Sequence, residues 1–371
     1  MIRDNSEVRR SEVSHSAFQK HAEVWGLNSE VRRLRSEVEF SMMNQSVVAT
    51  PTASLPTIAE IKAAQQLVYA VMPPTPQIVW PLLCERLGAE AWVKHENHTP
   101  IGAFKARTAI VYAAELFRES NNIKGLVAAT RGNHGQSVAL AARRFNVAAH
   151  VVVPHGNSAE KNAAMRAQGA DLIEFGNDFQ ESKEHAQKLA AEHGWHFVPS
   201  YHHNIVKGVA TYWLEFFSAV VDLDVVYVPI GQGSGICSCS AVRNGLNLKT
   251  RIVGVVPEGA PAYALSFEAG RKVAAPVTTR LGDGMACRVP DDASLAVVLE
   301  NVDRVLQVSE EEIAHAMKIY FTDTHNVVEG AGAAGLAAAL KEKQTLRGKR
   351  VGLVVTGGNV DHDVFAQVLR D

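Results

Sequence analysis

Lys105 lies in an apolar setting that suits a lysine with a chemical role. It directly follows Ala103 and Phe104. Apolar neighbours that bury an amine lower its pKa, and a lysine that is deprotonated near neutral pH can bond to an aldehyde or act as a base. Because most lysines are mobile surface charges, Lys105 alone predicts nothing. Three further segments of the chain, taken together with Lys105, predict a site.

The first of these segments, Thr130-Arg131-Gly132-Asn133-His134-Gly135-Gln136, joins an expected strand to an expected helix. The Thr130 hydroxyl, the backbone N–H groups of the turn and the Asn133 side chain could bind a carboxylate or a phenolate. The alternative interpretation is an N-cap turn, in which Asn133 hydrogen-bonds the helix terminus. Taken alone, the segment favours the N-cap.

A glycine-rich turn, Gly231-Gln232-Gly233-Ser234-Gly235, also follows a strand and opens a helix. Glycines at alternate positions let the backbone approach a phosphate, and the N–H groups and dipole of the helix favour an anion. A dinucleotide-binding turn is disfavoured because Ile236 stands where G-x-G-x-x-G requires glycine. A purely structural turn stays an alternative for this segment alone.

The last segment, Thr356-Gly357-Gly358-Asn359, follows the final expected strand. If the ligand contains a pyridine ring and the threonine hydroxyl faces its nitrogen, the hydroxyl offers no negative charge. The ring nitrogen then stays unprotonated, and the ring is a weaker electron sink. Such a ring favours elimination of a β-leaving group over transamination. In this order, the four segments indicate a site for pyridoxal phosphate.

The ordered set resembles the serine/threonine dehydratases of pyridoxal-phosphate fold type II, from about residue 56 to the C-terminus. The resemblance implies Lys105 as the catalytic residue. It implies that the substrate carboxylate is bound by Thr130, Gly132, Asn133 and His134. It implies that the cofactor is held by Phe104, Lys105, Asn133, Gly231, Gln232, Gly233, Ser234, Gly235 and Thr356.

Arg131 and Glu329 are candidates for contact with the substrate side chain. In the related serine racemases a serine at the position of Arg131 serves as an acid opposite the lysine, and arginine is a poor proton donor, so racemisation is disfavoured. Arg131 could instead pair with a substrate carboxylate, point to solvent or brace a domain interface. The racemases also build a divalent-cation site from acids that Val256–Ala262 lacks at the matching positions, so no metal is expected.

The activity implied is that of an ammonia-lyase, which converts an L-β-hydroxy amino acid to a 2-oxo acid and ammonia by β-elimination. L-threonine or L-serine is the default substrate. One alternative is a dehydratase of a bulkier or acidic β-hydroxy amino acid, such as threo-phenylserine or 3-hydroxyaspartate. A β-replacement synthase and a non-catalytic binding protein that keeps the scaffold are further alternatives.

Short β-rich runs alternate with helical segments, which predicts parallel sheets covered on both faces. Strands are expected at 91–94, 125–129, 148–153, 171–175, 225–229, 251–256 and 350–355, and helices at 103–119, 135–145, 158–168, 178–193 and from 236. The resemblance implies an α/β fold with two parallel-sheet domains of the tryptophan-synthase-β-like architecture. We expect a large domain of 51–116 plus 204–371, with a small inserted α/β domain at 117–203.

Residues 1–50 carry short charged repeats with too few apolar residues to bury a core, which predicts a disordered or mis-started tail. The chain of 371 residues has a net charge of −2, so no nucleic-acid partner is expected. No apolar run is long enough to predict a membrane helix. Four scattered cysteines indicate reduced thiols in a cytoplasmic protein. The expected partner is a small amino-acid substrate, and a homodimer is compatible with this interpretation.

Overall fold

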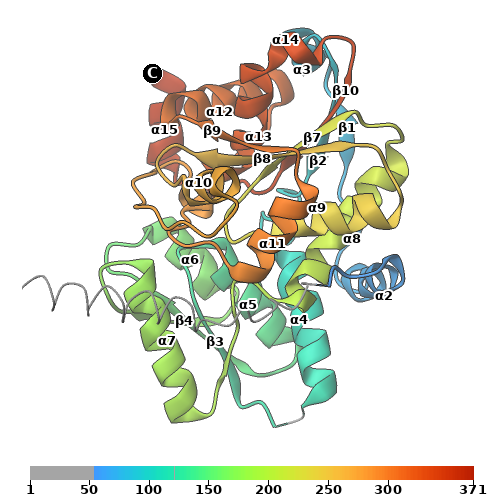
Figure 1. Ribbon diagram of the computed structural model, residues 1–371. Coiled ribbons are helices and arrows are strands. Elements are labelled where there is room, and N and C mark those ends of the chain that lie inside the picture. The colour runs from blue at the N-terminus through green and yellow to red at the C-terminus, as the bar shows by residue number, and fades with distance from the viewer. Residues whose placement is uncertain (1–53, 121) are drawn as a thin grey trace, which may run out of the picture. The chain divides into compact units, whose positions relative to one another are not determined.

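The computed structural model describes residues 54–120 and 122–371 (Figure 1). The predicted tail at 1–50 lies outside these residues. No helix in the described part of the chain combines the length and apolarity needed to cross a membrane. The elements in chain order are α2 (Ile58–Tyr69), β1 (Gln77–Val79), α3 (Pro81–Leu87), β2 (Glu90–His95), α4 (Lys105–Glu119), β3 (Gly125–Ala129), α5 (Asn133–Arg144), β4 (Ala148–Val153), α6 (Ala159–Ala167), β5 (Ala170–Glu174), α7 (Phe179–His193), β6 (His196–Phe197), α8 (His203–Ala219), β7 (Val225–Pro229), α9 (Ser234–Gly245), β8 (Arg251–Pro257), α10 (Ala262–Ala269), η1 (Asp283–Met285), α11 (Asp292–Asn301), β9 (Arg304–Val308), α12 (Glu310–Thr324), α13 (Gly330–Lys341), α14 (Lys343–Leu346), β10 (Arg350–Val355) and α15 (His362–Arg370).

The strands of the described residues form two sheets. One has six strands in the order β1-β2-β10-β7-β8-β9, and the other has four in the order β5-β4-β3-β6. All pairings are parallel except that β1 runs antiparallel to β2 at the edge of the larger sheet. The predicted α/β fold with two parallel sheets is confirmed, with β1 as an antiparallel addition. The four-stranded sheet lies inside the predicted inserted domain, whose boundaries at 117 and 203 stay a prediction.

Helices cover both faces of the six-stranded sheet, because successive residues of a strand point to opposite faces. Along β7, Val226 and Val228 join a core with residues of α8, α9 and α11. Val225 and Tyr227 join a second core with residues of α3, α12 and α13. Burial of each such side chain contributes about 1.5–3 kcal/mol, which explains why this strand is apolar throughout instead of alternating.

Helix α13 approaches the larger sheet closely because it consists mostly of glycine and alanine. A Cβ atom on Gly335 would lie 3.0 Å from the Tyr227 carbonyl oxygen, and one on Gly332 would lie 2.9 Å from the Gly357 carbonyl oxygen. The helix begins directly after Glu329. Its small residues therefore bring the Glu329 carboxylate to the sheet edge at which β10 ends.

The segments that carry the candidate site residues follow the carboxyl ends of parallel strands in both sheets. The turn at 130–132 follows β3 of the smaller sheet, while the glycine turn and Thr356 follow β7 and β10 of the larger one. Ligands of open parallel sheets bind beyond such carboxyl ends. The fold thus brings together segments that lie far apart in the sequence.

Candidate active site

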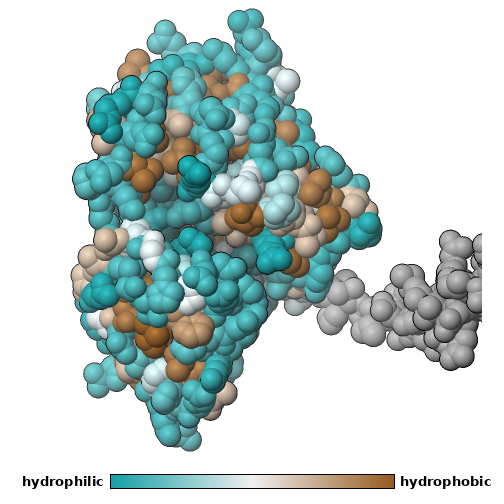
Figure 2. All heavy atoms as spheres, turned by 90° about the vertical axis from the view of Figure 1, so that its left-hand side faces the viewer, coloured by the Kyte–Doolittle hydropathy of each residue, from teal (hydrophilic) through white to brown (hydrophobic). Residues whose placement is uncertain are grey.

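A cavity of about 180 Å³ lies among these segments. It includes every residue that the sequence analysis assigned to the site: Phe104, Lys105, Thr130, Arg131, Gly132, Asn133, His134, Gly231, Gln232, Gly233, Ser234, Gly235, Glu329 and Thr356. The surface is hollowed on the face shown in Figure 2. The structure therefore places all the candidates together, and the role of each stays a prediction.

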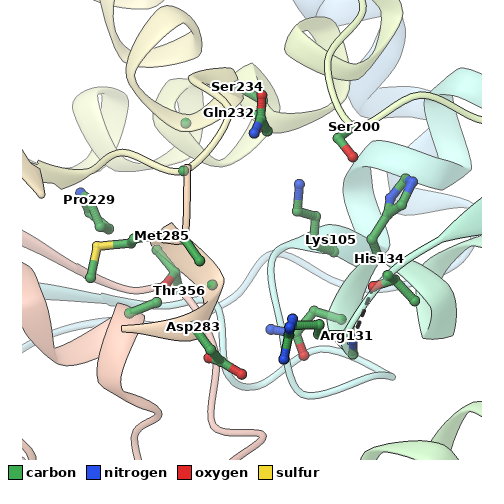
Figure 3. A pocket seen from close by; sticks show the side chains of 18 of the residues that line it. Lys105, Arg131, His134, Ser200, Pro229, Gln232, Ser234, Asp283, Met285 and Thr356 are labelled. Carbon is green, nitrogen blue, oxygen red and sulfur yellow. Dashed lines mark hydrogen bonds between the residues drawn. The ribbon is translucent and has the colours of Figure 1, made fainter. Parts of the chain in front are cut away.

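Lys105 is the first residue of α4, and its side chain extends into the cavity toward the loop of Gln232 and Ser234 (Figure 3). The Phe104 N–H donates to the Thr356 carbonyl at 2.9 Å, and Ala103 forms an antiparallel bridge with Gly357. The end of β10 thus holds the lysine segment. Burial lowers the pKa of Lys105 to about 8, so much of its amine is neutral at mildly alkaline pH.

The Thr130 turn presents donors to the cavity. The Gly132 N–H donates to the Thr130 hydroxyl oxygen at 3.0 Å, which leaves the hydroxyl hydrogen available to a ligand. Helix α5 begins at Asn133, and the first N–H groups of a helix have no partner within that helix. A Cβ on Gly135 would lie 2.6 Å from Thr130 Cγ2, so only glycine lets the helix start this close to the turn.

The Asn133 side chain bonds to two segments that pack with the larger sheet, one at Glu329 and the other at Asn359. Its Nδ2 donates to both carboxylate oxygens of Glu329 at 3.0 Å, and its Oδ1 accepts from Asn359 Nδ2 at 2.7 Å. The N-cap residue of α5 is Gly132, with no side-chain cap. The N-cap interpretation of Asn133 is therefore wrong, because its amide joins α5 to residues that surround the cavity.

Glu329 is a buried carboxyl group beside Asn133, with 7% of its surface exposed. Burial raises its pKa to about 7, and repulsion from Asp283 adds to this, while Asn133 and Lys161 oppose it. Near neutral pH the group is thus divided between its charged and neutral forms. Its predicted contact with the substrate side chain stays a prediction.

His134 is buried, and its Nε2 lies 3.3 Å from the Val198 carbonyl oxygen, so Nε2 carries the hydrogen of the neutral ring. Burial and the nearby Lys105 charge lower the pKa of His134 to about 4. The buried Nδ1 has no partner within the described residues. In this tautomer Nδ1 can only accept, so His134 can offer a carboxylate its backbone N–H but not its ring.

The glycine turn combines a left-handed backbone, two close approaches of its backbone to neighbouring residues, and the start of a helix. Gly233 has a φ of 96°, in the left-handed region, and a Cβ there would lie 2.5 Å from Ser294 Cβ. A Cβ on Gly231 would lie 2.7 Å from the Gly284 carbonyl oxygen. Helix α9 begins directly afterwards at Ser234, so its free N–H groups and its dipole favour an anion at the turn.

The sequence analysis missed an ion pair at the cavity. Lys161 of α6 contacts Asp283 of η1, with 2.5 Å between Nζ and Oδ2. Burial would lower the pKa of Lys161, but the carboxylates of Asp283, Glu329 and Asp361 outweigh it, so that pKa is raised. The signal that could have indicated Asp283 is its place between two glycines.

A second missed feature is a buried charge network behind Lys105. Arg107 donates to both oxygens of Glu96, at 2.8 and 3.0 Å, and of Glu215, at 2.6 and 2.9 Å. Lys94 Nζ donates to Glu215 at 2.6 Å. The two cations and two carboxylates balance, and they fix α4 against β2 and α8. This network positions Lys105 two residues earlier on the same helix.

Residues 70–357 match the family model of pyridoxal-phosphate dependent enzymes. The chain belongs to this family. It is 33% identical over 316 residues to L-threo-3-hydroxyaspartate ammonia-lyase of Saccharomyces cerevisiae, covering 85% of this chain and 97% of that protein. It is 35% identical over 314 residues to L-threonine ammonia-lyase of Thermotoga maritima, covering 84% and 78%. Among solved structures, maize serine racemase superposes with a TM-score of 0.79 at 29% identity, covering 85% and 98%.

These matches confirm the serine/threonine dehydratase family, the type II fold, the pyridoxal phosphate cofactor and the class of carbon–nitrogen lyase. The site fits this cofactor on physical grounds. Lys105 offers an amine of lowered pKa, the glycine turn offers an anion site, and Thr356 offers a neutral hydroxyl at the cavity.

Proposed function

We propose that this enzyme removes water and ammonia from an L-β-hydroxy amino acid, with L-threonine and L-serine as default substrates, and yields a 2-oxo acid. The observation that carries the proposal is the state of Lys105. Its amine has a pKa of about 8, lines a cavity and has no ion-pair or hydrogen-bond partner within the described residues. An amine in this state can bond to an aldehyde and can accept a proton.

The cofactor would be held by three parts of the chain. The N–H groups at the start of α9 would bind its phosphate, and Lys105 would bond to its aldehyde carbon. Thr356 would face the ring nitrogen with a neutral hydroxyl. When bound, pyridoxal phosphate withdraws electrons and stabilises negative charge at the substrate Cα.

The substrate carboxylate would bind at the Thr130 turn, through the Thr130 hydroxyl and the N–H groups of Asn133 and His134. The substrate amine would first replace Lys105 on the cofactor aldehyde carbon. The freed Lys105 Nζ would then take the Cα proton that this orientation presents to it. The Cβ–O bond would then break, and the hydroxyl group would leave as water with a proton that the cofactor phosphate held at the glycine turn could donate. The unsaturated amine that is released tautomerises, and its hydrolysis gives the 2-oxo acid and ammonia.

Racemisation needs a second acid on the face of the substrate opposite the lysine. Arg131 stands at the position where the family resemblance implies a serine in the racemases, and a guanidinium is a poor proton donor. We therefore favour elimination with Lys105 as the single base.

A dehydratase of an acidic β-hydroxy amino acid is the second candidate. The Saccharomyces cerevisiae relative is named for L-threo-3-hydroxyaspartate, and Arg131 lines the cavity of this chain. Both substrate types carry the same leaving group, so the same residues would serve either one.

The test is a 2-oxo-acid release assay of the holoenzyme with L-threonine, L-serine, threo-phenylserine and 3-hydroxyaspartate. We expect turnover of at least one of them, and loss of turnover by at least about a thousandfold in Lys105→Ala, as expected when both the anchor and the base are removed. Lys62→Ala, an exposed lysine on α2, is the control and should keep wild-type rates. Undiminished turnover in Lys105→Ala, or turnover of no substrate, would contradict the proposal.

A cytoplasmic location and a homodimeric state remain proposals based on the sequence. Light scattering of the purified holoenzyme tests the second of them. A mass of about twice the 40.2 kDa chain is expected, and a monomeric mass would contradict it.

A further inference from the structure

A second, larger cavity of about 1150 Å³ adjoins the one that contains Lys105. The residues that line both cavities are Ala129, Arg131, Phe179, Ser200, Gln232, Asp283 and Ala286. Figure 3 shows Arg131 on the opposite side of Lys105 from Ser234. Among the residues of the turn at 130–134 that would bind the substrate carboxylate or adjoin it, Arg131 is the one that also lines the larger cavity.

We call the residues that line both cavities the boundary. Arg131 is the charged residue of this boundary that has no partner among the described residues. It is exposed and makes no hydrogen bond or ion pair with the described residues. The other charged residue that lines both cavities, Asp283, is neutralised by Lys161. The boundary therefore presents a positive charge to whatever enters.

The acids of the larger cavity are also engaged. Asp178 accepts from the Glu181 N–H at the start of α7, and Asp291 accepts from two N–H groups at the start of α11. The remaining cations there, Lys183 and Arg288, have no salt-bridge partner within the described residues. Both carboxylates are already hydrogen-bonded at helix starts, where the helix dipole stabilises their charge, so Arg131 stays available to an anionic ligand.

We propose that Arg131 is a specificity-determining residue that binds a second substrate carboxylate, attached to Cβ. The inference rests on the proposed function and deepens it, because it names 3-hydroxyaspartate as a substrate class of this site. A guanidinium matches a carboxylate through two parallel N–H···O bonds. The bonds made and broken stay those of the elimination, and the product is a 2-oxo acid that keeps its second carboxylate.

The kinetic test compares kcat/KM for L-threo-3-hydroxyaspartate with that for L-threonine in the same holoenzyme preparations. Arg131→Gln should lower the ratio of the two values by about 10–100-fold, the range for loss of a charge-assisted hydrogen-bonded pair. Arg131→Lys should lower it less, because lysine keeps the charge but not the fork. Lys188→Gln, which removes an exposed cation on α7 that lines neither cavity, is the matched control and should leave the ratio unchanged.

A binding test needs no turnover. Calorimetric titration of the holoenzyme should show tighter binding of succinate than of butyrate, which lacks the second carboxylate, and Arg131→Gln should remove most of this preference. An unchanged kinetic ratio in Arg131→Gln, or equal binding of succinate and butyrate by wild type, would overturn the inference. If wild type acts on threonine but not on 3-hydroxyaspartate, the inference fails while the proposed function stands. If it acts on no β-hydroxy amino acid, the proposed function fails, and the titration still tests Arg131.

Discussion

Helix α4 carries two basic residues two positions apart in opposite electrostatic surroundings. Arg107 is fully buried and contacts the carboxylates of Glu96 and Glu215. Lys105 faces the cavity, and its amine contacts no carboxylate among the described residues. Burial disfavours charge at both residues, but Glu96 and Glu215 outweigh it and raise the pKa of Arg107, whereas nothing outweighs it at Lys105.

The difference separates a structural cation from a reactive amine. A buried cation surrounded by carboxylates stays charged and holds its neighbours in place. A buried amine without carboxylates loses its proton more readily and becomes a nucleophile or a base. The closed network around Arg107 thus fixes the helix, and the open site keeps Lys105 available.

The largest expected effect comes from breaking the closed network. Arg107→Met leaves two buried carboxylates with only Lys94 to compensate them, so the free energy of unfolding should fall by about 3–5 kcal/mol. Urea denaturation measures this change. Arg118→Met, on the same helix with a side chain 72% exposed, should cost at most about 1 kcal/mol. Equal losses in the two variants would show that the network has no special role.

The next effect is the pH dependence of stability that comes from Glu329, a buried carboxyl group that lines the same cavity as Lys105. The pKa of Glu329 is raised to about 7 from its ordinary 4.5, so its charged form is disfavoured in the folded protein. Its contribution to stability is full below about pH 4.5 and is lost as the pH rises through 7. Glutamine does not titrate. The free energy of unfolding of the apoenzyme should be compared between Glu329→Gln and wild type. As the pH rises from about 5 to about 8, the variant should gain about 2–3 kcal/mol of stability relative to wild type.

Glu342 provides the control for that experiment. Burial would raise its pKa, but hydrogen bonds from Arg304 and Tyr227 outweigh it, so the pKa is lowered. A group with a lowered pKa contributes stability above its unfolded pKa. Glu342→Gln should thus not gain relative stability as the pH rises. If the free energy of unfolding changes with pH in the same way in Glu329→Gln and in wild type, the assignment of a raised pKa to Glu329 is contradicted.

The smallest effect concerns the glycine turn at 231–235, whose proposed role is to bind the cofactor phosphate. Gly233→Ala would strain a left-handed backbone and push against Ser294, which costs about 1–3 kcal/mol and should weaken cofactor binding about 10–100-fold. Fluorescence titration of the apoenzyme with pyridoxal phosphate measures the affinity. Gly270→Ala has a similar φ of 62° but open space around its Cβ, so it should leave the affinity unchanged. Equal affinity in the two variants would contradict the proposed role of the turn.

Much of the site could be predicted from the sequence because each part is a short, continuous segment after a strand. Lys105, the glycine turn and Thr356 each indicate their chemistry by local residue types, and their order along the chain indicates the family. The apolar strands at 125–129, 148–153, 225–229 and 350–355 were predicted with their observed bounds, since strands covered on both faces are continuously apolar.

The missed features depend on contacts between distant residues. Arg107 and Glu215 are 108 positions apart, and Lys161 and Asp283 are 122 apart, so no local pattern links them. Asn133 resembles an N-cap locally, and only the folded chain brings Glu329 and Asn359 to its amide. Strands β1, β6 and β9 were missed. The first two have three and two residues, too few for a periodic signal. Strand β9 has five residues, but arginine and glutamine interrupt its apolar run and most of it is only half-buried.

The central claim is that Lys105, and not another buried lysine, bonds to the cofactor. The direct measurement is borohydride reduction of the holoenzyme, which makes a lysine–cofactor bond permanent, followed by peptide mapping by mass spectrometry. We expect the added mass on the peptide that contains Lys105, because Lys94 is paired with Glu215 and Lys161 with Asp283. Added mass on Lys94 or Lys161, with none on Lys105, would contradict the account.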